Sequence, residues 1–329
     1  YSHRIIDILN YINNSRIKLD QTTPFCEGLV KQADPNGLRD YCFYENICVL
    51  SILTHSTFLL KILEHKLLPH FATIKNNFSE SIERFCNHIS NYIAFKNLLP
   101  ISSNFYNDYR VIKSLQCIFP LDVFNPDDLR VSNSLMIIEK YLINNQYILD
   151  PSNQKGISVY DNFILAHIYL KRFNSKAFDT FDWILNQSLS TGSWPDYINP
   201  QTFQGSSSGH SLKINSEFII FFRQCVIQEN KNELNLLPFI PSSWLPTSST
   251  PLHIQNAPTE FGTISFKLSK SSFGFTFELT STLFKSPHLI TLSLPVNILK
   301  INEASVPANL NSQNIIEFKD GTISLSIYI

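Results

Sequence analysis

Residues 192–211 read GSWPDYINPQTFQGSSSGHS and lie between two apolar stretches with helical periodicity. They contain a tryptophan, a carboxylate, a histidine and a Gly/Ser-rich turn. Connections between helices in compact domains are usually short, and longer loops are typically functional or disordered. The stretch therefore predicts one wall of a binding site, with a plain spacer as the alternative.

The chain around this stretch has the pattern of a helical domain, residues 1–234. Apolar residues recur at steps of three and four along 78–95, which is typical of one buried helix face, and another apolar helical run covers 209–228. Residues 41–63 are apolar on nearly all faces, which predicts a helix buried on all sides in the inner layer of a two-layer assembly. Antiparallel helical hairpins with short loops follow from this pattern, without a readable fixed-period repeat.

The pattern changes near residue 235. Residues 235–251 are rich in Pro and Ser and predict a linker. Apolar and polar residues then alternate in 264–268 and 273–279, and Lys-Asp-Gly-Thr at 319–322 is a hairpin signal. Residues 252–329 therefore predict a small antiparallel β-sandwich.

Composition excludes several classes of function. The 329 residues carry a formal net charge of -1, which gives no electrostatic basis for binding nucleic acid or an anionic membrane. Six cysteines without a C-x-x-C pair predict neither a metal site nor a disulfide framework, and no cofactor is expected. The apolar run 49–63 is interrupted by Thr54, His55 and Lys61, so no membrane span is predicted. The chain begins at Tyr1 inside a helical pattern, and we expect a processed product or the C-terminal part of a longer protein; the compartment stays open.

The order of motifs resembles a known group of enzymes. SWPDYINP ends a helical hairpin, GH follows the Gly/Ser turn, and SEFIIFFRQCV lies in the next helix. LNLLPFIPSSWL then leads to APTEFGTISFKL, which opens the β-domain. This order resembles the C-terminal part of the six-hairpin, (α/α)6-toroid glycoside hydrolases, the glucoamylase-like and rhamnosidase-like group. The resemblance covers about residues 158–280 well.

The resemblance implies hydrolysis of a glycosidic bond at the mouth of the toroid. Inverting enzymes use a carboxylic acid as proton donor and a carboxylate as base, roughly 6.5–9.5 Å apart. Asp196 is the expected base, and Asp40 or Glu45, where the chain enters its most apolar helix, is the expected donor. Burial at that entry would raise the pKa of a carboxyl, as a donor needs. Alternatively, Asp196 is a turn acid, Asp40 pairs with Arg39, and Glu45 is a solvated acid at a helix start.

The remaining candidates concern the substrate, which the resemblance implies is a carbohydrate. Trp194 and Tyr197 could form a platform for a sugar ring or plug a helix end, and His210 could bind a hydroxyl or be structural. The hairpins needed for a complete toroid would come from an upstream segment or a second chain. Two other functions stay open: a non-catalytic relative that binds a glycan or a protein, and a polysaccharide lyase. The lyase is disfavoured because 192–211 contains no Arg or Lys.

Overall fold

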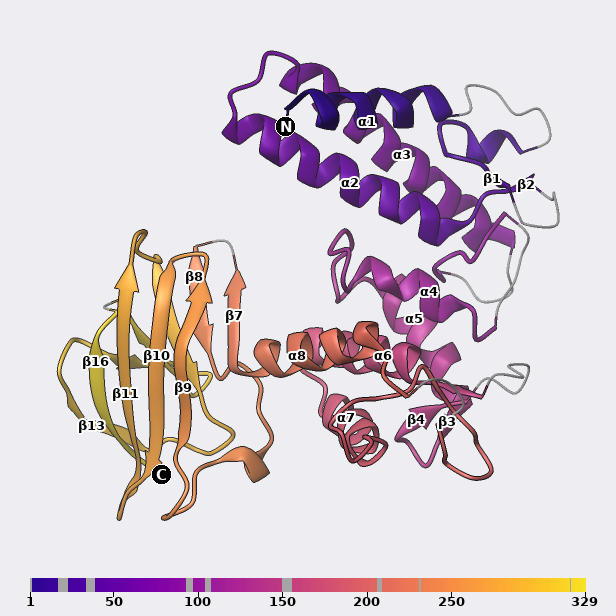
Figure 1. Cartoon of the computed structure of the whole chain (residues 1–329). Coiled ribbons are helices and arrows are strands. Elements are labelled where there is room, and N and C mark those ends of the chain that lie inside the picture. Colours follow the sequence, from indigo (N-terminus) through magenta and orange to yellow (C-terminus); the bar gives the residue numbers. More distant parts are fainter. Residues whose placement is uncertain are drawn as a thin grey trace. The chain divides into compact units, whose positions relative to one another are not determined.

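The computed structural model separates a helical part from a β-part, as the two periodicities predict (Figure 1). Contacts between residues divide the chain into two compact units, Tyr1–Ile214 and Asn215–Ile329. The structure describes residues 2–16, 23–33, 39–92, 97–103, 108–149, 156–205, 209–230, 232–319 and 321–329.

The first unit is built from helices, with a few two-residue strands at their ends. The unit contains two helical hairpins, in which α2 packs against α3 and α6 packs against α7. The last helix, α8, crosses the division between the units. The helices are α1 (Ser2–Ser15), α2 (Phe43–Ile62), α3 (Leu68–Tyr92), α4 (Val111–Ser114), α5 (Leu129–Ile138), α6 (Val159–Lys171), α7 (Lys176–Asn186) and α8 (Leu212–Val226). The short strands are β1 (Gln32–Ala33), β2 (Arg39–Asp40), β3 (Leu142–Ile143), β4 (Tyr147–Ile148), β5 (Ile157–Ser158) and β6 (Tyr197–Ile198).

Side-chain caps fix where two of these helices begin. Ser158 precedes α6, and its hydroxyl accepts a hydrogen bond from the Asp161 N–H at 3.2 Å. Asp128 precedes α5 and accepts from the Arg130 N–H at 2.8 Å. The Arg130 guanidinium also pairs with the carboxylates of Asp128, at 2.6 Å, and of Glu83 in α3, at 2.7 Å. Each cap satisfies an N–H that the first helical turn would leave without a partner.

Helix α2 departs from its expected burial on all sides. Phe43 and Ile47 are fully buried, whereas Phe58 and Ile62 are each 62% exposed. The apolar pattern on all faces did not reveal that one face of α2 is exposed in the structure. By length and composition α2 is also the one described helix that could cross a membrane, with 39% of the tested window buried. In this structure it packs against α3 and α4.

The second unit contains two five-stranded sheets (Figure 1). One has the strand order β13-β16-β11-β10-β9 and the other β14-β15-β12-β8-β7. Their strands are β7 (Ile227–Asn230), β8 (Glu233–Leu236), β9 (Leu252–Thr259), β10 (Gly262–Lys270), β11 (Gly274–Leu283), β12 (Leu289–Ser293), β13 (Lys300–Ala304), β14 (Asn309–Leu310), β15 (Ile315–Phe318) and β16 (Ile323–Tyr328).

Alternating side chains bring the two sheets into contact. Phe277 of β11 and Phe318 of β15 are buried, and their ring centroids lie 6.5 Å apart. The described strand pairs are antiparallel except β8 with β12, which is parallel. The residues of β7 and β8, 227–236, lie before the expected start of the β-domain. Strand β8 alternates over only four residues and β7 directly follows α8, so the helical periodicity before them masked both strands.

Candidate active site

The two helical hairpins of the first unit begin with the same buried clamp. Asn46 of α2 accepts from the Val30 N–H at 2.8 Å and donates to the carbonyls of Val30 and Cys42 at 3.1 and 2.9 Å. Asn162 of α6 accepts from the Ile148 N–H at 2.8 Å and donates to the carbonyls of Ile148 and Ser158 at 3.4 and 2.8 Å. Both asparagines are fully buried. Each one fastens a preceding segment to the first turn of its helix.

The sequence around the two clamps is related. Tyr-Glu-Asn at 44–46 matches Tyr-Asp-Asn at 160–162. An asparagine fixed on the helix also fixes its neighbours, because successive residues of an α-helix point about 100° apart. The tyrosine and the acid before each asparagine therefore leave the helix start in defined directions.

In each hairpin, the chain that follows the second helix returns to the start of the first helix. The N–H of Phe43, at the start of α2, donates to the Ile101 carbonyl at 3.0 Å. The N–H of Val159, at the start of α6, donates to the Asp196 carbonyl at 3.1 Å. The next residue then pairs with the residue before the helix in both hairpins, as the bridge 42–102 and the β5–β6 pair 158–197. Leu-Pro-Ile at 99–101 thus corresponds to Trp-Pro-Asp at 194–196.

This equivalence shows what the fold requires at position 196. The structural contact is made by a backbone carbonyl, which any residue supplies, and the first hairpin has Ile101 there. An acid is therefore not demanded by the fold at this place. The Asp196 side chain is exposed.

A pocket of about 640 Å³ opens where these helix starts meet. Its walls come from the first turns of α2, α6 and α8, from α4 and the residues just after it, and from the turn that carries Asp196. Glu45, Asp196 and Tyr197, three residues that the sequence singled out, lie together in it. The lining residues are Cys42, Tyr44, Glu45, Lys113, Gln116, Ser158, Tyr160, Asp161, Asp196, Tyr197 and Lys213.

The other predicted site residues lie elsewhere. Trp194 is 4% exposed, donates its indole N–H to the Ile184 carbonyl at 2.8 Å and meets Phe163 edge-on, so it has the place of a core side chain. His210 is exposed, and its Nδ1 lies 2.7 Å from the Ser193 hydroxyl. Neither lines the pocket. The side chain of Asp40 lies outside the described residues.

Sequence reasoning missed Asp161, the second acid of the repeated motif. Its carboxylate accepts a hydrogen bond from the Tyr109 hydroxyl at 2.5 Å. Burial raises the pKa of Asp161, against the opposing effects of hydrogen bonds with Tyr109 and Ser158. A carboxyl with a raised pKa in a pocket is a candidate proton donor. The signal in the sequence was Ser158 three residues before an acid, the spacing of a helix capping box.

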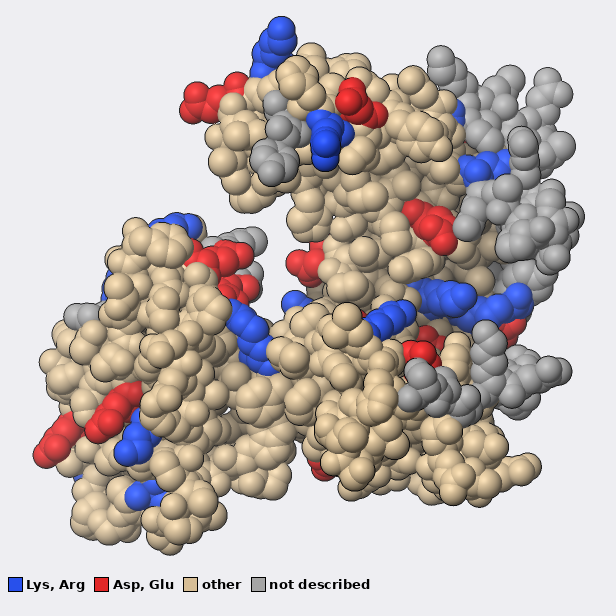
Figure 2. All heavy atoms as spheres, viewed as in Figure 1, with Lys and Arg blue, Asp and Glu red and all other residues tan. Residues whose placement is uncertain are grey.

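Two lysines complete the pocket. Lys113 of α4 and Lys213 of α8 both favour the charged form of Asp161 and so lower its pKa. The Lys213 ammonium lies 3.1 Å from the centre of the Tyr160 ring, within the range of a cation–π contact. In the helical unit, Figure 2 shows a row of basic side chains with acidic side chains on both sides of it. The pocket therefore combines three carboxylates with two cations.

Nothing in the described part of the chain offers a metal site. No group of three His, Cys, Asp or Glu residues there could hold an ion. The described cysteines are free thiols, and burial raises the pKa of Cys86 and Cys225 to about 12, which leaves these thiols protonated at neutral pH.

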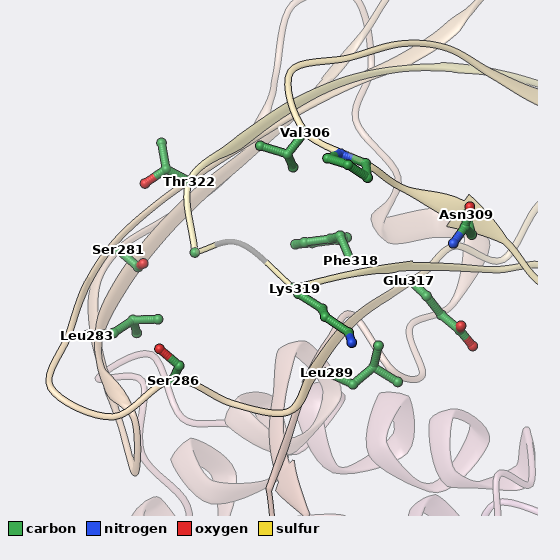
Figure 3. A pocket seen from close by; sticks show the side chains of 12 residues that line it. Ser281, Leu283, Ser286, Leu289, Val306, Asn309, Glu317, Phe318, Lys319 and Thr322 are labelled. Atoms are coloured by element: carbon green, nitrogen blue, oxygen red, sulfur yellow. The ribbon is translucent and has the colours of Figure 1, made fainter.

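A second cavity, of about 800 Å³, lies in the β-unit. Figure 3 shows Phe318 and Val306 beside it, with the hydroxyls of Ser281 and Thr322 at its edge. Among its described lining residues Glu317 is the one carboxylate, and it accepts a hydrogen bond from the Asn311 amide at 2.7 Å. Glycosidic hydrolysis by two carboxylates has no second acid here. The pocket of the helical unit is therefore the candidate active site.

Comparison with known proteins places this fold. No protein-family model matches the chain, and no curated protein matches it significantly. The structure of α-L-rhamnosidase from Dictyoglumus thermophilum matches with a TM-score of 0.57 and 9% identity, over 99% of this chain and 36% of that one. The fold resembles that of the α-L-rhamnosidases. The Streptomyces avermitilis α-L-rhamnosidase, solved with L-rhamnose, matches with a TM-score of 0.55 and 9% identity, over 98% of this chain and 30% of that one.

The likeness to α-L-rhamnosidases runs through both units, since it covers nearly the whole chain. It supports the rhamnosidase-like side of the resemblance seen in the sequence. The chain spans about a third of the length of either enzyme. At 9% identity the likeness concerns the fold and does not carry an activity over to this chain.

Proposed function

We propose that this chain is a glycoside hydrolase-like protein that binds a carbohydrate in the pocket of its helical unit and hydrolyses a glycosidic bond there with inversion. One observation carries the proposal: Glu45, Asp161 and Asp196, from three segments far apart in the sequence, line the same pocket. Hydrolysis with inversion needs one carboxyl to protonate the leaving oxygen and another to activate water.

Asp196 is the proposed base. Its backbone already makes the contact that the fold requires, and the equivalent residue of the other hairpin, Ile101, has no acid. The Asp196 side chain is exposed, so that a water molecule can reach its carboxylate. The Val159 N–H and the adjacent β5–β6 pair hold the backbone from which this carboxylate extends in a fixed position relative to α6. A fixed base is what orientation of the attacking water demands.

Asp161 is the proposed proton donor. It lies on the same hairpin as Asp196, and burial raises its pKa as the role of a general acid requires. The Tyr109 hydroxyl donates to the carboxyl, and the Ser158 cap on α6 holds the backbone of Asp161. Glu45, the donor proposed from the sequence, has the equivalent position on α2 and lines the pocket from the α2–α3 hairpin. The experiment below assigns the step to one of them.

Aromatic side chains fit the same function. Tyr44 and Tyr197 line the pocket from two segments, and their rings offer apolar faces for a sugar ring. We propose Tyr197 as a sugar contact. Trp194 supports the turn from the core, and His210 would contact only a sugar that extends beyond the pocket.

The architecture around the pocket follows from the same proposal. The repeated helix start of α2 and α6 supports a toroid of helical hairpins, and contact between the two β-sheets supports a β-sandwich. In a complete toroid, further hairpins from an upstream segment or a second chain would join those of this chain.

The test measures hydrolysis by the purified chain on a panel of oligosaccharides and aryl glycosides. Asp196→Asn should lower kcat/KM by roughly 10²–10⁴, the usual contribution of a general acid or base. Added azide should restore turnover by Asp196→Ala, because a small anion can take the place of the activated water. Asp7→Asn, an exposed acid on α1, is the control and should keep full activity.

Leaving groups of different acidity identify the donor. Asp161→Asn should lose activity on oligosaccharides but keep it on dinitrophenyl glycosides, whose leaving group departs without protonation. If Glu45→Gln shows this behaviour instead, Glu45 is the donor. Oligosaccharide binding without hydrolysis by any variant would overturn the catalytic proposal and favour a glycan-binding protein.

A further inference from the structure

Hydrolysis by two carboxylates does not require the two lysines of the pocket. Lys113 and Lys213 come from helices α4 and α8, about a hundred positions apart in the sequence, yet both line the pocket and both act on the charge of Asp161. None of the ion pairs found among the described residues includes Lys113. Asp161 has hydrogen-bonding partners of its own in Tyr109 and Ser158.

An aromatic ring helps to fix the position of the Lys213 ammonium. Its ammonium lies 3.1 Å from the centre of the Tyr160 ring, and Tyr160 is itself a lining residue whose hydroxyl donates to the Gln116 side chain at 3.3 Å. A cation held over a pocket wall is an anchor for a charged group of a ligand. Lysine side chains are otherwise costly to hold in one place, because ordering them loses much rotamer entropy.

A neutral sugar is bound mainly by hydroxyl hydrogen bonds and by stacking, and it does not need two ammonium groups in one pocket. Both lysines are exposed, so a ligand in the pocket can reach them. Residues 192–211 contain no Arg or Lys, but the fold brings Lys113 and Lys213 to the pocket from other segments.

We propose that the pocket selects a glycan with an anionic substituent, a uronic acid carboxylate or a sulfate ester, and that Lys113 and Lys213 bind this group. The inference rests on the proposed function in one respect, that the ligand is a carbohydrate. It goes beyond that function because it names the chemical class of the sugar and the residues that choose it.

The test is calorimetric binding at low salt, with Asp196→Asn so that the glycans stay intact. The probes are oligosaccharides that contain glucuronic or galacturonic acid, their methyl esters, and sulfated and unsulfated galactan oligosaccharides. Each anionic probe thus has a neutral partner of the same backbone. We expect an anionic probe to bind at least about tenfold more tightly than its neutral partner, which is the usual effect of one hydrogen bond to a charged group. The uronate and sulfate arms distinguish the two sources of charge.

Lysine variants locate the selectivity. Lys113→Met and Lys213→Met keep the length of the side chain and remove the charge, and each should weaken the anionic probe about tenfold while the neutral probe is unchanged. Lys61→Met is the matched control, because it lies near the C-terminal end of α2, roughly 24 Å along the helix from Glu45. Circular dichroism of each variant verifies folding.

The outcomes separate this inference from the proposed function. If anionic glycans bind selectively but neither the unmodified chain nor any variant hydrolyses a glycan, the inference stands and the catalytic proposal fails. If neutral glycans are cleaved and the two lysine variants bind and cleave like the unmodified chain, hydrolysis stands and the inference is overturned. Equal binding of every charged and neutral pair also overturns it.

Discussion

The repeated asparagine clamp leads to a quantitative prediction about the stability of the helical unit. In Asn162→Ala, the Ile148 N–H and carbonyl lose their side-chain partners, while the Ser158 carbonyl keeps the first hydrogen bond of the helix. A buried backbone group without a partner costs about 1–3 kcal/mol. Two such groups, with some relief from β3–β4 pairing at Ile148, give an expected loss of about 2–4 kcal/mol in the free energy of unfolding.

Asn46→Ala should lose a similar amount, since it removes the same three hydrogen bonds, to Val30 and Cys42. The Cys42 carbonyl keeps the helical bond from the Asn46 N–H. Asn76→Ala is the control, because Asn76 is exposed in the middle of α3 and alanine favours a helix. Its stability should be unchanged or slightly higher.

Urea unfolding followed by circular dichroism at a helical wavelength reports on the first unit, which holds most of the helices. The shift of the midpoint at constant slope gives the change in stability. A loss below about 1 kcal/mol for either clamp would refute the reasoning from unsatisfied backbone groups. A loss for one clamp only would refute the equivalence of the two hairpins.

Two further changes test the helix cap and the turn beside the site. Asp128→Ala should lower the free energy of unfolding by about 1–2 kcal/mol at neutral pH, because the cap and the ion pair are lost. The hydrogen bonds from Arg130 lower the pKa of Asp128, so this stability is present above the ordinary aspartate pKa and is lost as the pH falls below it. Urea unfolding should therefore show a smaller difference in stability between the variant and the unmodified chain at acid pH than at neutral pH. Gly156→Ala should cost more than Gly192→Ala in the same assay, because both have positive φ but a Cβ at Gly156 would lie 2.4 Å from the Ile198 carbonyl oxygen, whereas nothing lies within 4 Å at Gly192.

Some of the residues chosen from the sequence lie together in the structure, and others do not. Asp196, Glu45 and Tyr197 were chosen from short motifs, and the structure brings them into one pocket. Trp194 was chosen with them because an aromatic beside an acid is typical of a sugar site. A single sequence does not reveal which way a side chain in a tight turn points, and Trp194 points into the core.

Lys113 and Lys213 were beyond reach for another reason. Each is an ordinary charged residue in the first turns of a helix, and no local pattern distinguishes it from a solvated lysine. Their meaning comes from helix starts that converge in space. Convergence depends on how the hairpins pack, which the apolar periodicity of each helix does not specify.

The repeat that organises the site also escaped a search for a fixed period. Helices α2 and α3 of the first hairpin have 20 and 25 residues, whereas α6 and α7 of the second have 13 and 11. Any period set by one hairpin therefore fails in the other. The helix starts remain alike because a buried asparagine must meet two backbone groups and a preceding carbonyl within hydrogen-bonding distance.

The ends of the hairpins opposite the pocket are under no such constraint, since the helices can lengthen there into solvent without moving their first turns. The conserved geometry of the two hairpins is thus confined to the end that forms the pocket. Against this shared geometry, the difference between Ile101 and Asp196 stands out. Both supply the same backbone carbonyl, but the second hairpin adds a carboxylate that lines the pocket, so the fold does not account for the acid at 196, and its proposed role as the base does.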